Sequence, residues 1–193
     1  MLHEKLASKN IILASASPRR QQFLRDLEMD FTIQLKPVDE IYDPALKEAA
    51  ITDFLAQLKA TPFQGTLKDA DILVTSDTIV WANNVALGKP TDAQNAYDII
   101  KSLSGKTHSV ISSVCLTSTK KQHVFNDVTL VSIKELSDEE INYYIQNFNP
   151  YDKAGAYGIQ EWFGYIAVEK IEGSFFNVMG FPIHKFYKEI LEF

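Results

Sequence analysis

Segments with the apolar pattern of buried strands alternate along this chain with segments that have the spacing of amphipathic helices. A short apolar run between polar residues fits a buried strand, and apolar side chains at i, i+3, i+4 and i+7 fit one face of a helix. The predicted strands cover residues 10–15, 31–35, 72–82, 85–87, 108–118, 123–135 and about 163–171. The predicted helices cover residues 18–29, 44–60, 92–103, 138–148 and a terminal segment from about 183. This alternation, with one long antiparallel pair, predicts an α/β fold with a mixed sheet.

Length and composition restrict the domain organisation. The chain has 193 residues, of which 46% are hydrophobic and 23% charged, an ordinary balance for a globular protein. No Pro-, Gly- or Ser-rich linker divides it, so we expect one domain over residues 1–193, with room for two tightly joined lobes. The only cysteine, Cys115, lies in an alternating apolar run and has no disulfide partner, which indicates a core residue in a reducing compartment.

The charge and the apolar runs also exclude classes of partner. The formal net charge of −6 argues against a general binder of duplex nucleic acid, which usually presents a broad basic face. No run approaches the roughly 20 apolar residues that cross a bilayer, and the apolar run at 11–14 is too short for a signal peptide. We therefore expect a cytoplasmic protein without a membrane partner.

Basic residues gather near the N-terminus in spite of the acidic total. Residues 1–25 hold five basic side chains and one acidic one, and Arg19 and Arg20 fall in the first turn of a predicted helix. Free N–H groups at a helix start favour an anion, and arginines add forked donors that match phosphate oxygens. Ser15 and Ser17 are small enough to let a phosphate approach the backbone. The alternative is a capped surface helix with solvated arginines, but arginines there oppose the helix dipole, which favours the phosphate site.

Two carboxylates are candidates for a metal site. Asp77 lies inside the otherwise apolar run 72–80, where a carboxylate is costly unless it is paired or bound to a metal. Glu40 follows another predicted strand. Two carboxylates with waters and phosphate oxygens suit Mg²⁺ or Mn²⁺. The alternatives are an aspartate at an exposed strand end and a solvated acidic loop, and for Glu40 alone the loop is the simpler interpretation.

Two lysines and a glutamine complete the candidates. Lys89 lies in the tight turn GKP, and Lys59 ends the helix predicted at 44–60, where a plain surface cation is the simpler interpretation. Gln160 ends the segment 152–160, whose two glycines permit close backbone approach. Its amide has a donor beside an acceptor, so it can pair with the edge of a nucleobase.

Six segments taken together resemble the Maf family of nucleoside triphosphate pyrophosphatases. They are ILASASPRR at 12–20, SDT at 76–78, GKP at 88–90, SGKTHSV at 104–110, DKAGAYGIQ at 152–160 and EGSFFNVMGFPI at 172–183. They occur in the family's order over nearly the whole chain. The segment DKAGAYGIQ resembles the branch that acts on dTTP and UTP, and not the branch that acts on 7-methyl-GTP.

The resemblance implies a fold and an activity. The implied fold is ITPase-like (Maf/Ham1), an elongated mixed sheet with helices and two lobes that flank a nucleotide-binding cleft. The implied activity is hydrolysis of dTTP and UTP to the monophosphate and pyrophosphate, by metal-assisted attack of water on the α-phosphorus, with a further role in removing modified nucleotides. The implied cofactor is Mg²⁺ or Mn²⁺, and the implied assembly is a homodimer.

The resemblance also assigns roles to single residues. Asp77 would be the proton acceptor and would share the metal with Glu40. The residues that would help to set substrate preference are Arg19, Thr78 and Gln160. The residues that would hold phosphates are Arg20, Lys59 and Lys89, together with Ser15 and Ser17.

Departures from the family pattern leave two other functions open. Ser76 stands where the family usually has Ala, and Glu161-Trp162 follow Gln160 where it often has Gly, which bears on substrate preference. One alternative is a Maf pyrophosphatase for 7-methyl-GTP or other modified nucleotides. The other is a protein that senses a nucleotide or contacts the division machinery without turnover.

Overall fold

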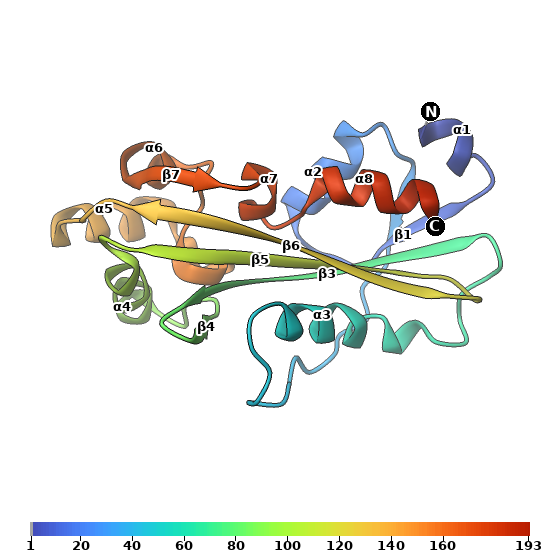
Figure 1. Ribbon diagram of the computed structural model, residues 1–193, viewed down its shortest axis with the longest axis horizontal. Helices are drawn as coiled ribbons and strands as arrows, with labels where there is room; N and C mark the ends of the chain where they lie inside the picture. The colour runs from blue at the N-terminus through green and yellow to red at the C-terminus, as the bar shows by residue number, and fades with distance from the viewer. Residues whose placement is uncertain (1) are drawn as a thin grey trace. The chain divides into compact units, whose positions relative to one another are not determined.

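The strands form one mixed sheet, as predicted. A computed structural model describes residues 2–193 (Figure 1) and pairs the strands in the order β2-β1-β3-β5-β6-β7, with β4 beside β3. Strand β1 is parallel to β2 and β3, whereas β4 is antiparallel to β3 and β7 to β6. The strands are β1 Asn10–Leu13, β2 Phe31–Ile33, β3 Asp71–Ala82, β4 Val85–Leu87, β5 Thr107–Thr117, β6 Gln122–Ile133 and β7 Val168–Glu172.

Contacts within the chain divide it into two compact units. The first unit comprises Met1–Asp77, Ser112–Asp127 and Gly180–Phe193, and the second comprises Thr78–Ile111 and Val128–Met179. The helices of the first unit are α1 Leu2–Leu6, α2 Pro18–Asp26, α3 Ala49–Leu58 and α8 Ile183–Glu192. Those of the second unit are α4 Ala93–Leu103, α5 Asp138–Phe148, α6 Trp162–Ala167 and α7 Phe175–Val178.

In the first unit, helices cover both sides of β1 and β3. Figure 1 shows α2 and α8 on one side of these strands and α3 on the other. Helix α3 is tied to β3 by the hydroxyl of Thr75, which donates to the Ala56 carbonyl at 2.6 Å. Because side chains alternate along a strand, the residue two positions further on, Asp77, faces α3 as well.

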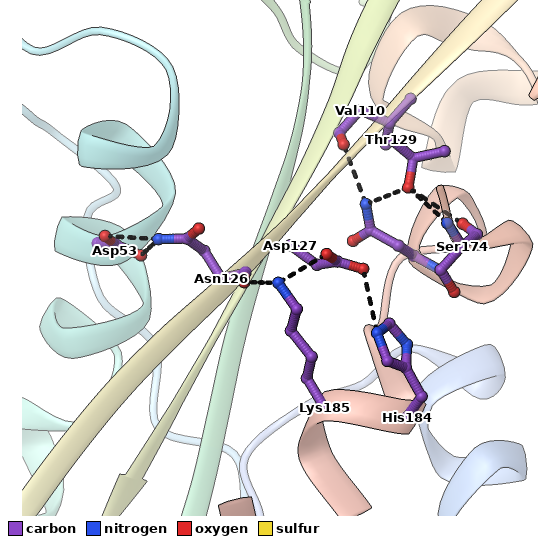
Figure 2. A network of polar contacts seen from close by, with 9 residues as sticks. Asp53, Val110, Asn126, Asp127, Thr129, Ser174, His184 and Lys185 are labelled. Carbon is purple, nitrogen blue, oxygen red and sulfur yellow. Dashed lines mark hydrogen bonds and ion pairs between the residues drawn. The ribbon is translucent and has the colours of Figure 1, made fainter. Parts of the chain in front are cut away.

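Helix α8 is held to β6 by charge. The ammonium of Lys185 lies 2.8 Å from the Asp127 carboxylate and donates to the Asn126 carbonyl, also at 2.8 Å (Figure 2). The side-chain amide of Asn126 donates in turn to both oxygens of Asp53 in α3. These contacts tie both α8 and α3 to β6 within the first unit.

In the second unit, a buried tyrosine lies in the aromatic part of the core. Tyr144 of α5 is fully buried, and its ring contacts those of Phe148, Trp162 and Phe163. Helix α5 begins with the capping box that its sequence predicts, in which Ser137 and Glu140 satisfy each other's backbone N–H groups. The tyrosine therefore offers a fixed hydroxyl to the segment that carries Gln160.

Three predicted boundaries differ from the observed ones by three residues or more, each for a local reason. The helix predicted from residue 44 begins at Ala49, because Glu48 has φ 51°, which no α-helix accommodates. The helix predicted to reach residue 29 ends at Asp26, before Glu28 with φ 55°. The strand predicted at 163–171 begins only at Val168, because the preceding residues form α6. A short apolar run fits a buried helix as well as a buried strand, so the sequence pattern could not separate them.

Cys115 is buried, as expected for a core residue, and burial raises the pKa of its thiol. Within residues 2–193, none of the helices combines the length and the apolar character that crossing a membrane requires.

Gly164 is required by close packing inside α6. A Cβ at this position would lie 1.7 Å from the carbonyl oxygen of Ile159. We expect Gly164→Ala to lower the free energy of unfolding by about 3 kcal/mol, because the backbone of the second unit must shift to admit the methyl group. Urea unfolding measures this, with Gly88→Ala as the control, since a Cβ there meets nothing within 4 Å. Equal losses in the two variants would contradict the packing argument.

His108 links the stability of the second unit to pH. Its Nε2 lies 2.7 Å from the Tyr157 hydroxyl, its Nδ1 has no hydrogen-bond partner among residues 2–193, and burial lowers its pKa to about 4. An unfolded histidine has a pKa near 6.5, so the unfolded state binds more protons between these values. We therefore expect stability to fall as the pH drops from about 6.5 to 4, with a contribution from His108 of about 2 kcal/mol by pH 4.5.

Urea titrations at pH 7 and pH 4.5 measure this contribution. His108→Gln keeps an amide for the Tyr157 hydroxyl but cannot titrate, so its stability should change less between the two pH values. An identical pH dependence in the variant and the wild type would show that His108 is not the group responsible.

Candidate active site

Asp77 and Glu40 share one ammonium in the first unit. Lys59 follows the last residue of α3, and its Nζ lies 2.6 Å from Oδ1 of Asp77 and 3.1 Å from Oε1 of Glu40. The Asp77 carboxylate is buried, the Lys59 side chain is 19% exposed and that of Glu40 is 53% exposed. The site thus opens to solvent on the side of Glu40.

The interpretation of Lys59 as a plain surface cation is wrong. Its ammonium compensates the buried charge of Asp77, which would be costly if it were left alone in an apolar strand. The sequence could not show this pairing, because Lys59 and Asp77 are 18 positions apart and meet only through the packing of α3 on β3.

Arg20 adds a second cation to this site. Its Nη1 donates to the Ser76 carbonyl at 2.8 Å and its Nε donates to the Gly180 carbonyl at 3.0 Å. Burial lowers the pKa of Arg20, while Asp77 and, less strongly, Glu40 act in the opposite direction. The guanidinium is therefore held in place by two backbone carbonyls and lies within electrostatic reach of both carboxylates.

The two serines lie at the start of α2, where the sequence predicts a phosphate site. Ser17 caps the helix, with its hydroxyl accepting from the Arg20 backbone N–H, and the buried Ser15 hydroxyl accepts from the Ser17 N–H at 3.2 Å. Arg19 is half-buried on the same first turn, and its charge acts on Arg20. Strand β1, the capped helix start and the two arginines thus occur together in the first unit.

The other predicted residues belong to the second unit. Thr78 follows Asp77 in β3 and is half-buried. Lys89 is exposed after β4, and Gln160 is half-buried before α6. Neither the Lys89 ammonium nor the Gln160 amide has a hydrogen bond or ion pair among residues 2–193, so both are available to a ligand.

The glycines of the segment 152–160 pack against the chain itself. Gly155 has φ 70°, and a Cβ there would lie 2.6 Å from Val80. A Cβ on Gly158 would lie 2.7 Å from the Glu161 carboxylate. The close approach that these glycines permit is therefore used to fold the segment tightly beside Gln160.

The donor set fits a hard divalent cation and does not fit a soft one. Among the side chains that the structure describes, those of residues 2 and 4–193, no group of three or more His, Cys, Asp or Glu could hold a metal ion. Mg²⁺ and Mn²⁺ need no such cage, because one or two carboxylates with waters and substrate phosphates suffice. Asp77 and Glu40 already lie around one cation, the ammonium of Lys59, which shows that both carboxylates can serve the same positive charge.

Comparison with known proteins identifies the family. A family model described as "Maf-like protein" matches residues 10–193, which include every candidate residue above. The chain belongs to the Maf family.

Close relatives of this Maf protein carry a common name. A protein of Flavobacterium johnsoniae is 61% identical over 188 residues, covering 97% of each chain, and is named "dTTP/UTP pyrophosphatase". A protein of Christiangramia forsetii with the same name is 54% identical over 192 residues, covering 100% of this chain and 98% of the relative. Among solved structures, the Ham1 protein of Staphylococcus aureus has a TM-score of 0.48 and 14% identity over 65% of this chain and 72% of that chain.

Some contacts of this Maf protein had no signal in the sequence. The carbonyls of Ser76 and Gly180 that hold Arg20 cannot be recognised, because every residue has a carbonyl. Glu161 was singled out only as a departure from the family pattern. Tyr144, which donates to Glu161 at 2.6 Å, looked like any other apolar residue of a helix face.

Proposed function

We propose that this Maf protein hydrolyses dTTP and UTP to the nucleoside monophosphate and pyrophosphate. The observation that carries the proposal is the cluster of Asp77, Glu40 and Lys59 beside Arg20, which places two carboxylates and two cations together in the first unit. Cations of this kind neutralise a polyphosphate, and the carboxylates supply a base and metal ligands. The name shared by its relatives supports the choice of substrate.

Asp77 and Glu40 would hold the Mg²⁺ or Mn²⁺ ion. When bound, such an ion neutralises phosphate charge and makes a water easier to deprotonate. Residues of the chain orient the water and accept its proton. Asp77 orients a water and accepts its proton, and the electron pair of that water forms a bond to the α-phosphorus. The bond from the α-phosphorus to the bridging oxygen breaks, and pyrophosphate leaves with that oxygen.

The cations position the triphosphate for this attack. Arg20 is already fixed by two carbonyls, so it holds its place without a large loss of conformational freedom when the substrate binds. Lys59 neutralises Asp77 before the substrate arrives and turns to a phosphate oxygen afterwards. Lys89 and the capped start of α2 at Ser15 and Ser17 supply further contacts for phosphates.

Base selection belongs to Arg19, Thr78 and Gln160. The Gln160 amide has no hydrogen-bond partner among the described residues, and its donor and acceptor can pair with the N3–H and a carbonyl of thymine or uracil. We expect the reaction to take place in the cytoplasm and the chain to act as a homodimer.

Assaying pyrophosphate release tests the function. Purified protein is incubated with dTTP, UTP, CTP or 7-methyl-GTP, each with Mg²⁺ or Mn²⁺. Release from dTTP and UTP ahead of the others is expected. Release chiefly from 7-methyl-GTP would favour the sister specificity, and binding without release from any nucleotide would favour a sensor.

Isotope labelling tests the position of attack. In water enriched with ¹⁸O, attack on the α-phosphorus places the label in the monophosphate and none in the pyrophosphate. Label in the pyrophosphate would show attack on the β-phosphorus and would rule out this arrangement of water and Asp77.

A further inference from the structure

Gln160 lies between two residues whose positions are fixed by a network of polar contacts. On its N-terminal side, the backbone N–H of Gly158 donates to the Tyr144 hydroxyl at 2.9 Å. On its C-terminal side, the backbone N–H of Glu161 donates to the Gly158 carbonyl at 3.1 Å. The backbone on both sides of Gln160 is thereby held in a single turn.

The carboxylate of Glu161 connects this turn to the rest of the second unit. Its Oε2 accepts from the Tyr144 hydroxyl at 2.6 Å, and its Oε1 lies 3.1 Å from the ammonium of Lys153. Lys153 is buried, with a second ion pair to Asp152 at 2.7 Å. Both oxygens of Glu161 therefore have a donor. The carboxylate thus connects Tyr144 of α5 with Lys153, at the other end of the segment 153–161.

The network has little freedom to move. Tyr144 is fully buried in the aromatic cluster, and burial, followed by the neighbouring Glu161, raises the pKa of its hydroxyl. The hydroxyl therefore stays protonated and keeps donating to Glu161. Gly158 packs so closely on Glu161 that a Cβ there would meet the carboxylate carbon at 2.7 Å.

We propose that Glu161 is a positioning residue that sets the nucleotide preference by fixing the backbone of Gln160. The proposal rests on the function above, in which Gln160 pairs with the base. Glu161 does not itself touch the nucleotide; it acts through Tyr144 and Lys153 on the turn that carries Gln160.

The chemistry of the bases explains why the position of Gln160 matters. Thymine and uracil present the N3–H donor beside carbonyl acceptors, whereas cytosine presents N3 as an acceptor beside an amino donor. A side-chain amide on a mobile backbone can shift along the base until its donor and acceptor both find partners. On a fixed backbone it meets a single edge, and at the edge formed by N3 and the O2 carbonyl it matches both groups of thymine or uracil but only one of the two acceptors of cytosine. Holding Gln160 therefore favours dTTP and UTP over CTP.

Glu161→Ala tests the proposal with the full chain. We expect kcat/KM for dTTP and UTP to fall about tenfold, chiefly through KM, while kcat/KM for CTP changes little, so that the preference over CTP is largely lost. Glu161→Gln keeps an oxygen that accepts from Tyr144 and should restore much of the preference. Glu169→Ala removes an exposed carboxylate of β7 and should leave the preference unchanged.

A purely structural role would give a different result. A lower melting temperature with the wild-type ratio of dTTP to CTP would overturn the proposal. So would an equal loss of kcat/KM for all three nucleotides. A lost preference that Glu161→Gln partly restores would support it.

A measurement of nucleotide binding without turnover distinguishes a failure of this proposal from a failure of the proposed function. The affinities of wild type and Glu161→Ala for α,β-imido analogues of dTTP and CTP can be measured by calorimetry, without turnover. If the wild type releases no pyrophosphate, the proposed function fails, but a loss of binding preference in Glu161→Ala still supports the positioning role. Equal binding preferences in the two proteins, or no binding by the wild type, would overturn it.

Discussion

Asp77→Asn is expected to lower kcat for pyrophosphate release by about 10²–10⁴-fold. A general base contributes acceleration of this order, and an amide cannot accept the proton of the attacking water. The amide oxygen can still accept from Lys59, so the fold and the affinity for nucleotide without metal should be largely kept. Steady-state release of pyrophosphate from dTTP, with nucleotide binding measured separately in EDTA, checks both parts.

Asp26→Asn is the matched control for Asp77→Asn. Asp26 is an exposed carboxylate at the end of α2 in the same unit, where it accepts a hydrogen bond from the side-chain amide of Gln22 at 2.7 Å. The same charge is removed away from the cluster, so wild-type kcat is expected. Turnover near the wild-type level in Asp77→Asn would remove Asp77 from the role of base.

Lys59→Met should separate nucleotide binding from metal binding. Loss of the ammonium removes a charged contact to phosphate, which is worth about 1.5–3 kcal/mol and corresponds to a fall in kcat/KM of roughly 10–100-fold. The same change removes a cation that occupies both Asp77 and Glu40 in the free protein. We therefore expect Mn²⁺ to bind more tightly to Lys59→Met than to the wild type when no nucleotide is present.

Titration calorimetry with Mn²⁺ alone and steady-state kinetics with dTTP measure the two effects. Lys101→Met is the control, because Lys101 also lies at the end of a helix and pairs with a carboxylate, Asp138, but in the second unit and well exposed. Weaker Mn²⁺ binding in Lys59→Met, or unchanged kinetics, would show that Lys59 does not have this double role.

Much of the fold could be predicted because apolar periodicity reflects burial directly. The long strands β3, β5 and β6 fall within a residue or two of their predicted limits, and the Ser137 capping box opens α5 as predicted. One error arose because a positive φ angle at Glu48 ended the helical pattern. Another arose because a single apolar run contains a helix followed by a strand, α6 and then β7. Positive φ at a non-glycine residue has no reliable signature in the sequence.

The candidate residues themselves came from local chemistry. Arginines in the first turn of a helix and an aspartate in an apolar strand are both unfavourable unless something compensates them, and this made Arg19, Arg20 and Asp77 conspicuous. Lys59 and Glu161 gave no comparable signal, because a charged residue at either end of a helix needs no special explanation. Their importance depends on what packs against them.

The sequence alone determined the fold class, the family and the types of residue in the site, since these depend on local pattern and on the identity of short motifs. Only the tertiary structure decided which charges meet: Lys59 with both Asp77 and Glu40, and Glu161 with both Tyr144 and Lys153. The reason is physical. Ion pairs act over a few ångströms, and the packing of α3 on β3, or of the segment 153–161 on α5, brings together residues that are remote in sequence.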